Sequence, residues 1–218
     1  MTPEPRPRLV AVHPGLGTMI SVHYVAPETV KAAFDEAVAA CWADIERIEA
    51  YLNSIRTLQA RFQQVAPDGQ LSHGSAWLAR PGHMRFQYDP PAPYLLVTSF
   101  GQLVYEDRSI NQISYIPLSR TPLGILLANR VSLSGGVTVT GIRRLPGQLE
   151  VSVIRTTAPG EGSLTLTFSE NPLALRQWTI VDAQRRATRV TLYNVQTGVR
   201  LNPGLFDFAD PRQGGNSG

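Results

Sequence analysis

The chain has 218 residues, of which 43% are hydrophobic and 17% charged, and its formal net charge is +3. This length suits one large all-β domain or two small ones, with room for a substantial core. The cations are nearly all arginines and are spread from Arg6 to Arg212, so nothing resembles the basic stripe of a nucleic-acid-binding protein. The sequence also lacks an apolar run long enough for a transmembrane helix.

Residues 1–27 contain five prolines and are predicted to form an irregular tail. Within them, Leu9–Val12 and Met19–Val25 each have the composition of a short strand. The one cysteine, Cys41, follows Val38-Ala39-Ala40, as at the end of a lipoprotein signal. Charged residues interrupt the segment before it, which favours a cysteine on a helix over a lipid-attachment site.

Residues 28–55 are predicted to be helical because alanine is abundant and Ile45, Ile48, Leu52 and Ile55 recur at helical spacing. The next segment, residues 57–65, is ambiguous. Leu58 and Phe62 continue the helical stripe, but Leu58, Ala60 and Phe62 also alternate as in a strand. We favour a strand, because Asn53-Ser54 is a plausible break and Asp68-Gly69 a hairpin turn.

Apolar and aromatic residues then alternate through a long region, and Pro, Gly and Asp cluster wherever the alternation breaks. This pattern predicts an antiparallel meander with one apolar face. The expected strands lie near residues 70–79, 83–89, 94–100, 102–106, 110–116, 137–143, 148–155, 163–169, 174–182 and 187–196.

A short apolar helix is predicted over residues 121–128, with Thr121 as N-cap and Pro122 at the first helical position. The last residues, 210–218, are polar and glycine-rich and are predicted to be disordered. We therefore expect one domain over residues 28–209 between two tails.

No motif for a nucleophile, a metal or a phosphate appears in the sequence. His73 and His83 lie on adjacent predicted strands and could face each other across a hairpin, but no carboxylate or cysteine stands beside them at metal-ligand spacing. We expect no catalytic residues, no metal and no cofactor. An apolar sheet without a catalytic set favours a protein that holds something hydrophobic.

Four segments together resemble the LolA family, the periplasmic carriers of outer-membrane lipoproteins. They are IERIEAYLNSIRTLQARFQQ, GSAWLARPGHMRFQYDPP, LLVTSFGQLVYED and TPLGILLA, within a similarity that spans residues 44–208. The resemblance implies a mainly β fold, an incomplete antiparallel β-barrel of ten to eleven strands covered by short helices that act as a lid. It implies a non-enzymatic carrier that binds acyl chains in a cavity. It also implies a periplasmic location, although residues 1–43 hold no clear export signal.

The resemblance also assigns roles to single residues. Arg80 matches the family arginine that keeps the lid shut by bonding to backbone oxygens, and residues 121–128 match the lid helix. The residues expected to line the acyl cavity are Phe62, Trp77, Met84, Phe86, Leu96, Val104, Tyr105, Leu123, Leu126 and Leu127.

The implied partners are acylated lipoproteins, an inner-membrane lipoprotein-releasing ABC transporter as donor and an outer-membrane lipoprotein receptor as acceptor, with no nucleic acid and a monomeric carrier. Three alternatives stay open. The chain could carry another lipid or glycolipid on the same scaffold, it could be the lipid-anchored receptor of the pathway, or it could be a module that senses mislocalised lipoproteins.

Overall fold

The computed structural model describes residues 8–15, 18–25 and 30–210. The chain divides into two compact units, residues 1–50 and 51–218. In the first unit, β1 (Arg8–Gly15) and β2 (Thr18–Val25) pair antiparallel. The expected irregular tail therefore contains a hairpin, and each strand is longer than the sequence suggested because pairing extends it. The start predicted for the first helix and nearly all of the predicted C-terminal tail lie outside the described residues.

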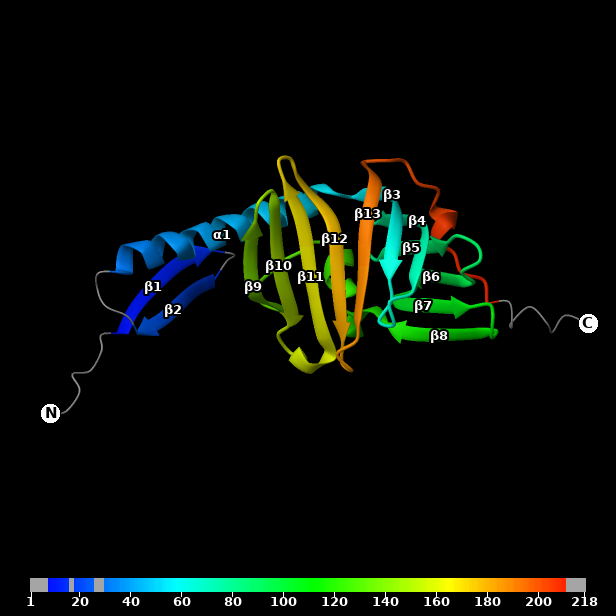
Figure 1. Ribbon diagram of the computed structural model, residues 1–218, viewed down its shortest axis with the longest axis horizontal. Helices are drawn as coiled ribbons and strands as arrows, with labels where there is room; N and C mark the ends of the chain where they lie inside the picture. The colour runs from blue at the N-terminus through cyan, green and yellow to red at the C-terminus, as the bar shows by residue number, and fades with distance from the viewer. Residues whose placement is uncertain (1–7, 16–17, 26–29, 211–218) are drawn as a thin grey trace, which may run out of the picture. The chain divides into compact units, whose positions relative to one another are not determined.

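The second unit is built on one antiparallel sheet of eleven strands (Figure 1). Helix α1 (Lys31–Ser54) ends where this unit begins. Two meanders make up the sheet. The first consists of β3 (Thr57–Val65), β4 (Leu71–Ala79), β5 (His83–Tyr88), β6 (Tyr94–Ser99), β7 (Gln102–Asp107) and β8 (Gln112–Pro117). The second consists of β9 (Val137–Leu145), β10 (Gln148–Arg155), β11 (Gly162–Glu170), β12 (Leu173–Asp182) and β13 (Ala187–Thr197).

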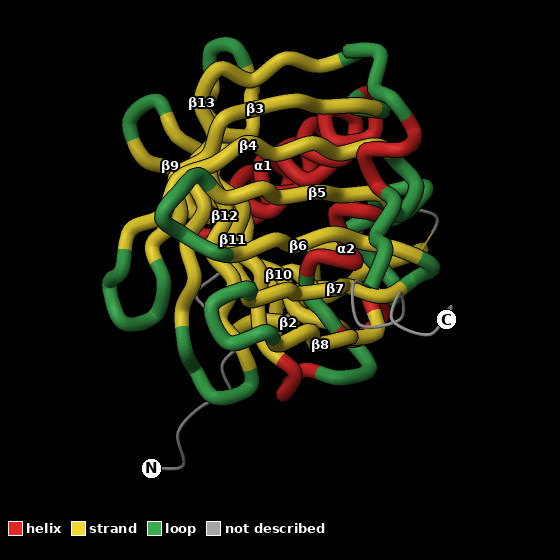
Figure 2. Tube along the Cα trace, turned by 90° about the vertical axis from the view of Figure 1, so that its right-hand side faces the viewer, coloured by secondary structure: helices red, strands yellow, loops and turns green. Residues whose placement is uncertain are grey.

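The two meanders join through β3 and β13, so the strand order is β8-β7-β6-β5-β4-β3-β13-β12-β11-β10-β9 (Figure 2). The strands turn from near vertical in β10–β12 to near horizontal in β6–β8, as the right-handed twist of a large sheet requires (Figure 1). The mainly β prediction is confirmed, and in the large sheet each expected strand boundary lies within two residues of the observed one. The sheet is open, and β8 and β9 are its edges.

Strand alternation gives the sheet an inner and an outer face. On the inner face, Leu58 and Phe62 of β3 lie opposite Leu78 and Gly74 of β4. The inner face continues through β13, β12, β11 and β10, where most inward residues are fully buried; these are Leu192, Trp178, Leu164, Leu166, Phe168, Leu149, Val151 and Val153. The core of the second unit is therefore the space enclosed by this face.

The chain must cross one face of the sheet to connect β8 with β9, because these strands lie at opposite edges. The connecting segment contains the 3₁₀ turn η2 (Leu118–Arg120) and the helix α2 (Leu123–Leu127). Leu123, Leu126 and Leu127 lie among inward residues of the sheet, so this segment crosses the inner face. Among the described residues, no helix combines the length and apolar character needed to cross a bilayer.

Part of the outer face is also covered, by the C-terminal segment that follows β13. Its 3₁₀ turn η4 (Pro203–Phe206) places the Phe206 ring 5.3 Å from the ring of His83. The Arg85 guanidinium donates to the carbonyl of Leu205 at 3.2 Å. This cover lies against β5 and β6, where the outward side chain Val97 is fully buried.

Gly74 is required for the close contact between β4 and its neighbours. A Cβ atom there would stand 2.2 Å from the Gln87 carbonyl oxygen and 2.6 Å from the Phe62 ring. We expect Gly74→Ala to lower the free energy of unfolding by about 1–3 kcal/mol through overpacking, measured by urea denaturation. Gly136→Ala is the matched control because a Cβ there meets no atom within 4 Å. Equal stability of the two variants would contradict this packing account.

A closed apolar pocket beneath helix α2

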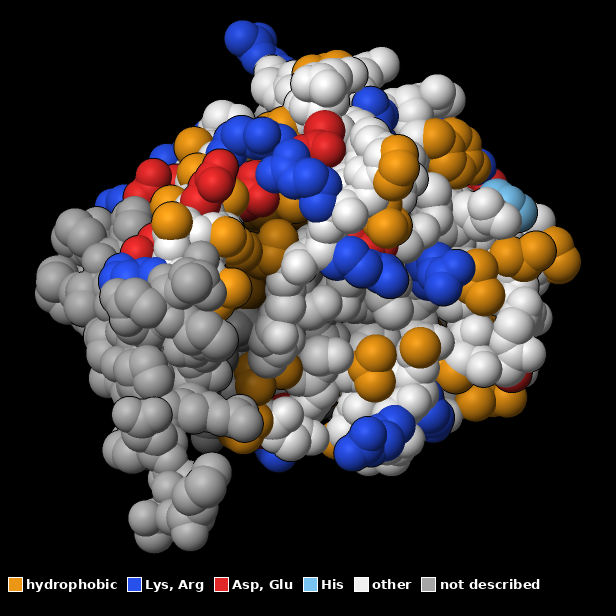
Figure 3. All heavy atoms as spheres, turned by 60° about the vertical axis from the view of Figure 1, so that its left-hand side comes forward, with side chains coloured by type: hydrophobic (Ala, Val, Ile, Leu, Met, Phe, Trp, Pro, Cys, Tyr) orange, Lys and Arg blue, Asp and Glu red, His pale blue; other side chains and the backbone are white. Residues whose placement is uncertain are grey.

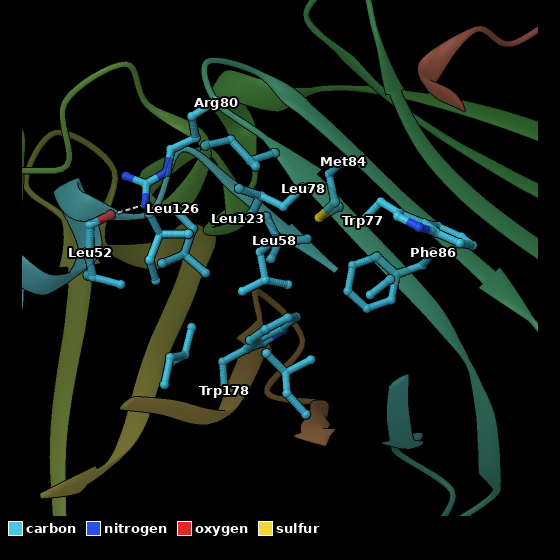
Figure 4. Close-up of a pocket in the computed structure, with 15 residues that line it drawn as sticks. Leu52, Leu58, Trp77, Leu78, Arg80, Met84, Phe86, Leu123, Leu126 and Trp178 are labelled. Carbon is cyan, nitrogen blue, oxygen red and sulfur yellow. Dashed lines mark hydrogen bonds between the residues drawn. The ribbon is translucent and has the colours of Figure 1, made fainter. Parts of the chain in front are cut away.

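The candidate site is a pocket between α2 and the inner face of the sheet (Figure 4). Apart from Arg80, it is lined by apolar side chains and aromatic rings from both meanders, from the end of α1 and from α2. The residues around it are Leu52, Ile55, Leu58, Ala76, Trp77, Leu78, Arg80, Met84, Phe86, Leu123, Leu126, Leu127, Leu175, Trp178 and Leu192. Such a lining can hold an apolar ligand and offers no group for acid–base chemistry.

In this conformation the pocket is almost filled. The volume open to the centres of water molecules is about 30 Å³, which corresponds to roughly two waters. A long acyl chain does not fit into this space. A ligand of that size would enter only if side chains around the pocket moved apart.

Helix α2 contributes Leu123, Leu126 and Leu127 to the pocket, and its side chains are buried. Leu123, Ile125, Leu126 and Leu127 are all less than 8% exposed. A helix of five residues is too short to be stable by itself, so packing and tethers hold it. The predicted N-cap is wrong: Pro122 occupies the N-cap position, and the Thr121 hydroxyl instead donates to the Leu118 carbonyl at 3.1 Å.

Backbone tethers hold the lid segment, residues 118–131, on both sides of α2. Before the helix, Leu118 N–H donates to the Gly101 carbonyl at 2.9 Å. At its end, Gly82 N–H donates to the Leu127 carbonyl, also at 2.9 Å. Beyond it, the Asn53 side-chain amide donates to the Val131 carbonyl at 2.8 Å and accepts from the Val131 N–H at 2.9 Å.

Arg155, at the end of β10, holds the start of the lid helix. Its guanidinium donates to the Thr121 carbonyl at 2.8 Å. Gly124 makes room for this contact, because a Cβ there would stand 3.1 Å from the Arg155 Nη2 and 2.6 Å from the Leu118 carbonyl oxygen. Sequence reasoning missed Arg155, since nothing in its surroundings distinguishes it from the other strand arginines.

The Arg80 guanidinium bonds to a different carbonyl from the one expected. It donates to the carbonyl of Leu52, in the last turn of α1, and not to the 121–128 segment (Figure 4). The backbone of Gly82, two residues later, supplies the contact with the lid instead. Burial, and then the nearby charge of Arg56, lower the pKa of Arg80. Arg80 thus ties the end of β4 to α1 at the border of the pocket.

Six of the ten residues expected to line the cavity stand around this pocket, namely Trp77, Met84, Phe86, Leu123, Leu126 and Leu127. Phe62, Leu96 and Tyr105 face inward but are not in its lining. Trp77 borders the pocket, yet the register sets its side chain on the outer face beside Gln59 and Arg85. Val104 is also on the outer face, opposite Val97. The expectation for Val104 fails because strand alternation fixes its face, whereas Trp77 remains among the residues around the pocket.

The inward residues outside the pocket form a packed aromatic cluster. The Phe62 ring lies 4.8 Å from that of Phe86 and 5.1 Å from that of Tyr88, and Tyr94 stacks on Tyr105 at 5.8 Å. The Tyr88 hydroxyl donates to Gln64 at 2.8 Å. Burial raises the pKa of Tyr88, and it raises that of Tyr105 to about 12. Both hydroxyls are therefore neutral at physiological pH, and the cluster adjoins the pocket through Phe86.

Several residues that line the pocket were not predicted from the sequence to do so. Leu52 and Ile55 belong to the helical stripe that it did identify, which was the available signal. Leu175, Trp178 and Leu192 reach the pocket from the second meander, and only the β3–β13 pairing brings them there.

The two strand histidines do not face each other. His83 pairs with Ala79, whereas the backbone carbonyl of His73 accepts from the Asp89 N–H at the far end of the same hairpin. In the described part of the chain, no three His, Cys, Asp or Glu side chains are grouped as a metal site. Cys41 lies exposed within α1.

Comparison with known proteins gives a consistent match. Residues 53–209 match the family model described as outer membrane lipoprotein carrier protein LolA. The chain is 30% identical over 174 residues to an outer-membrane lipoprotein carrier protein of Methylococcus capsulatus, covering 76% of this chain and 83% of that relative. It is 29% identical over 181 residues to one of Coxiella burnetii, with 76% and 82% covered. A crystal structure of a LolA superfamily protein from Nitrosomonas europaea aligns at a TM-score of 0.42 and 10% identity, covering 75% of this chain and 97% of the other.

The contact between Arg155 and Thr121 gives a test of how the lid is held. We expect Arg155→Met to speed amide hydrogen exchange in residues 118–131 by about tenfold, because a charge-assisted hydrogen bond is lost. Hydrogen exchange with mass spectrometry measures this. The control is Arg120→Met, which removes an exposed ion pair with Glu161 at 3.7 Å and should change exchange by less than about threefold. Equal acceleration in both variants would rule out a specific tether.

Proposed function

The chain belongs to the outer membrane lipoprotein carrier family LolA, and from this premise we propose that it carries lipoproteins by holding their acyl chains in the pocket beneath α2. The observation that carries this proposal is an apolar pocket closed by a short helix with four buried side chains. Loading consists of an exchange in which acyl carbons replace the α2 side chains against the inner face.

This exchange keeps binding reversible. Each buried methylene contributes about 0.8 kcal/mol, so one acyl chain represents on the order of 10 kcal/mol of gross transfer energy. A carrier that retained all of this energy would not release its cargo. Displacing α2 exposes Leu123, Ile125, Leu126 and Leu127 and breaks their tethers, and this cost offsets part of the gain. The net affinity remains low enough for transfer to an acceptor.

The family premise also suggests the route. We propose a monomeric carrier in the periplasm that receives lipoproteins from an inner-membrane lipoprotein-releasing ABC transporter. It delivers them to an outer-membrane lipoprotein receptor. The carrier itself needs no cofactor and performs no reaction, because each transfer moves the cargo between apolar surfaces.

Adjacent residues of β3 offer a matched test of the binding face. Leu58 points inward to the pocket, whereas Gln59 is exposed on the outer face. We expect a photo-crosslinking amino acid at position 58 to capture a triacylated lipoprotein during release from inner-membrane vesicles, and one at position 59 not to. The readout is a crosslinked band on an immunoblot.

Position 126, on α2, serves as a second inward position if the variant at position 58 does not fold. Equal capture from positions 58 and 59 by folded variants, or capture from position 59 alone, would refute binding at the inner face. Circular dichroism of each variant checks that the fold is retained.

In this proposal Arg80 helps to hold the closed form through Leu52. We expect Arg80→Leu to fold but to release its cargo about tenfold more slowly, because the closed form loses a charge-assisted hydrogen bond and the pocket becomes more apolar. Transfer of lipoprotein from the loaded carrier to receptor-containing vesicles measures this. Arg85→Leu is the matched control, since Arg85 also donates to a backbone carbonyl but lies on the outer face. Unchanged release by the Arg80 variant would remove Arg80 from the mechanism.

A further inference from the structure

Backbone contacts bring the positions of four arginines together near one border of the pocket, which Arg80 itself lines. Arg80 N–H donates to the Arg56 carbonyl at 2.8 Å, and the Arg56 guanidinium donates to the Asn129 carbonyl at 3.3 Å, next to Arg130. The Thr57 hydroxyl donates to the Val199 carbonyl at 2.7 Å. This bond places Arg200, which follows Val199, near Arg56, which precedes Thr57. We call Arg56, Arg80, Arg130 and Arg200 the arginine rim.

The rim differs from the rest of the surface in how its charge is balanced. Elsewhere in the described ranges six arginines pair with a carboxylate, and the face drawn in Figure 3 shows acidic and basic side chains next to one another. These pairs are Arg61–Asp89, Arg108–Glu106, Arg120–Glu161, Arg143–Glu150, Arg144–Glu170 and Arg186–Asp182. Among the described residues, no carboxylate is ion-paired with any arginine of the rim. Their summed charge is therefore available to an external anion.

Arg80 connects the rim to the pocket. Its side chain stands in the pocket lining, while its backbone contacts Arg56. The Nε–H of Arg80 is buried and has no hydrogen-bond acceptor in the described structure. A buried donor without a partner is costly and calls for a specific explanation. An acceptor group of a ligand at this border would satisfy it.

We propose that the arginine rim binds the negatively charged head group, carboxylate or phosphate, of an amphiphile whose acyl chain occupies the pocket. This inference rests on the proposed function, because it uses the same apolar site. Arginine suits this role, since its planar fork pairs with carboxylate and phosphate oxygens through two parallel hydrogen bonds. A single molecule can contact both regions because Arg80 belongs to each.

An amphiphile explains the observations better than an acidic protein surface. A protein docking on the exposed guanidinium groups of Arg56, Arg130 and Arg200 would leave the buried Nε–H of Arg80 without an acceptor. A head group attached to a chain in the pocket is drawn to the border where this N–H lies. The position of the buried donor therefore favours a ligand that enters from the pocket side.

The test compares ligands of equal chain length and different charge. Dodecanoate, dodecyl phosphate and uncharged monolauroyl glycerol are titrated below their critical micelle concentrations by calorimetry. We expect the two anions to bind about tenfold or more tightly than the neutral lipid at low salt, and this preference to shrink as salt rises. A preference for only one anion identifies the head group as a carboxylate or as a phosphate.

Paired variants locate the effect. Arg130→Gln with Arg200→Gln should remove most of the preference for anions and leave binding of the neutral lipid unchanged. The control is Arg185→Gln with Arg189→Gln, since these two exposed arginines lie at the opposite end of β13 and also lack a carboxylate partner among the described residues.

The outcomes separate this inference from the proposed function. Equal binding of charged and neutral lipids by the unmodified chain overturns the anion site and leaves acyl binding in place. An equal loss of preference in the control pair also overturns it, because the effect would then reflect net charge. Failure of all three lipids to bind would count against the proposed acyl pocket itself. Capture of an acidic protein without any lipid preference would assign the rim to a protein partner and refute the head-group site.

Discussion

The burial of four α2 side chains against an open sheet is the interaction on which the rest of this structure depends. The inner face of the sheet is apolar from β3 to β12 and would otherwise meet water across the whole concave side. The chain covers it with a helix of five residues that has little stability of its own. In the proposed function, the side chains that complete the core are also the ones that the cargo displaces, and their exposure offsets part of the binding energy. A longer or better-capped helix would complete the core more firmly and make the pocket inaccessible.

Topology and tethers together decide where this cover lies and how it is held. The covering segment joins the two edge strands and so must cross the sheet, and the packing of α2 shows that it crosses the concave side. Its contacts come from both meanders, through Gly82 and Gly101 on one side and Arg155 on the other. Each contact engages a backbone group of the lid. The lid sequence can therefore vary in its exposed side chains without losing its attachment.

The sequence predicted the strands well because alternation, turn residues and the Arg80-Pro81-Gly82 turn all agree locally. It predicted the site less well, since the site depends on relations between distant segments. Trp77 and Val104 are apolar residues in strands, but their faces follow from register, which composition does not reveal. The bond from Arg80 to Leu52 and the tether from Arg155 to Thr121 join residues 28 and 34 positions apart. The N-terminal hairpin was underestimated because five prolines dominate the pattern of its segment.

The seam between β3 and β13 has a consequence for how the protein is made. Every other strand pair of the large sheet joins neighbours in the chain, whereas this one pairs Phe62 with Leu192. Closing so long a loop is entropically costly, so local hairpins form more readily than the seam. Until β13 has been synthesised, β3 and the apolar inner face of the first meander lack the strand that joins them to the second meander. The two halves of the pocket lining are therefore brought together only after most of the chain has been made.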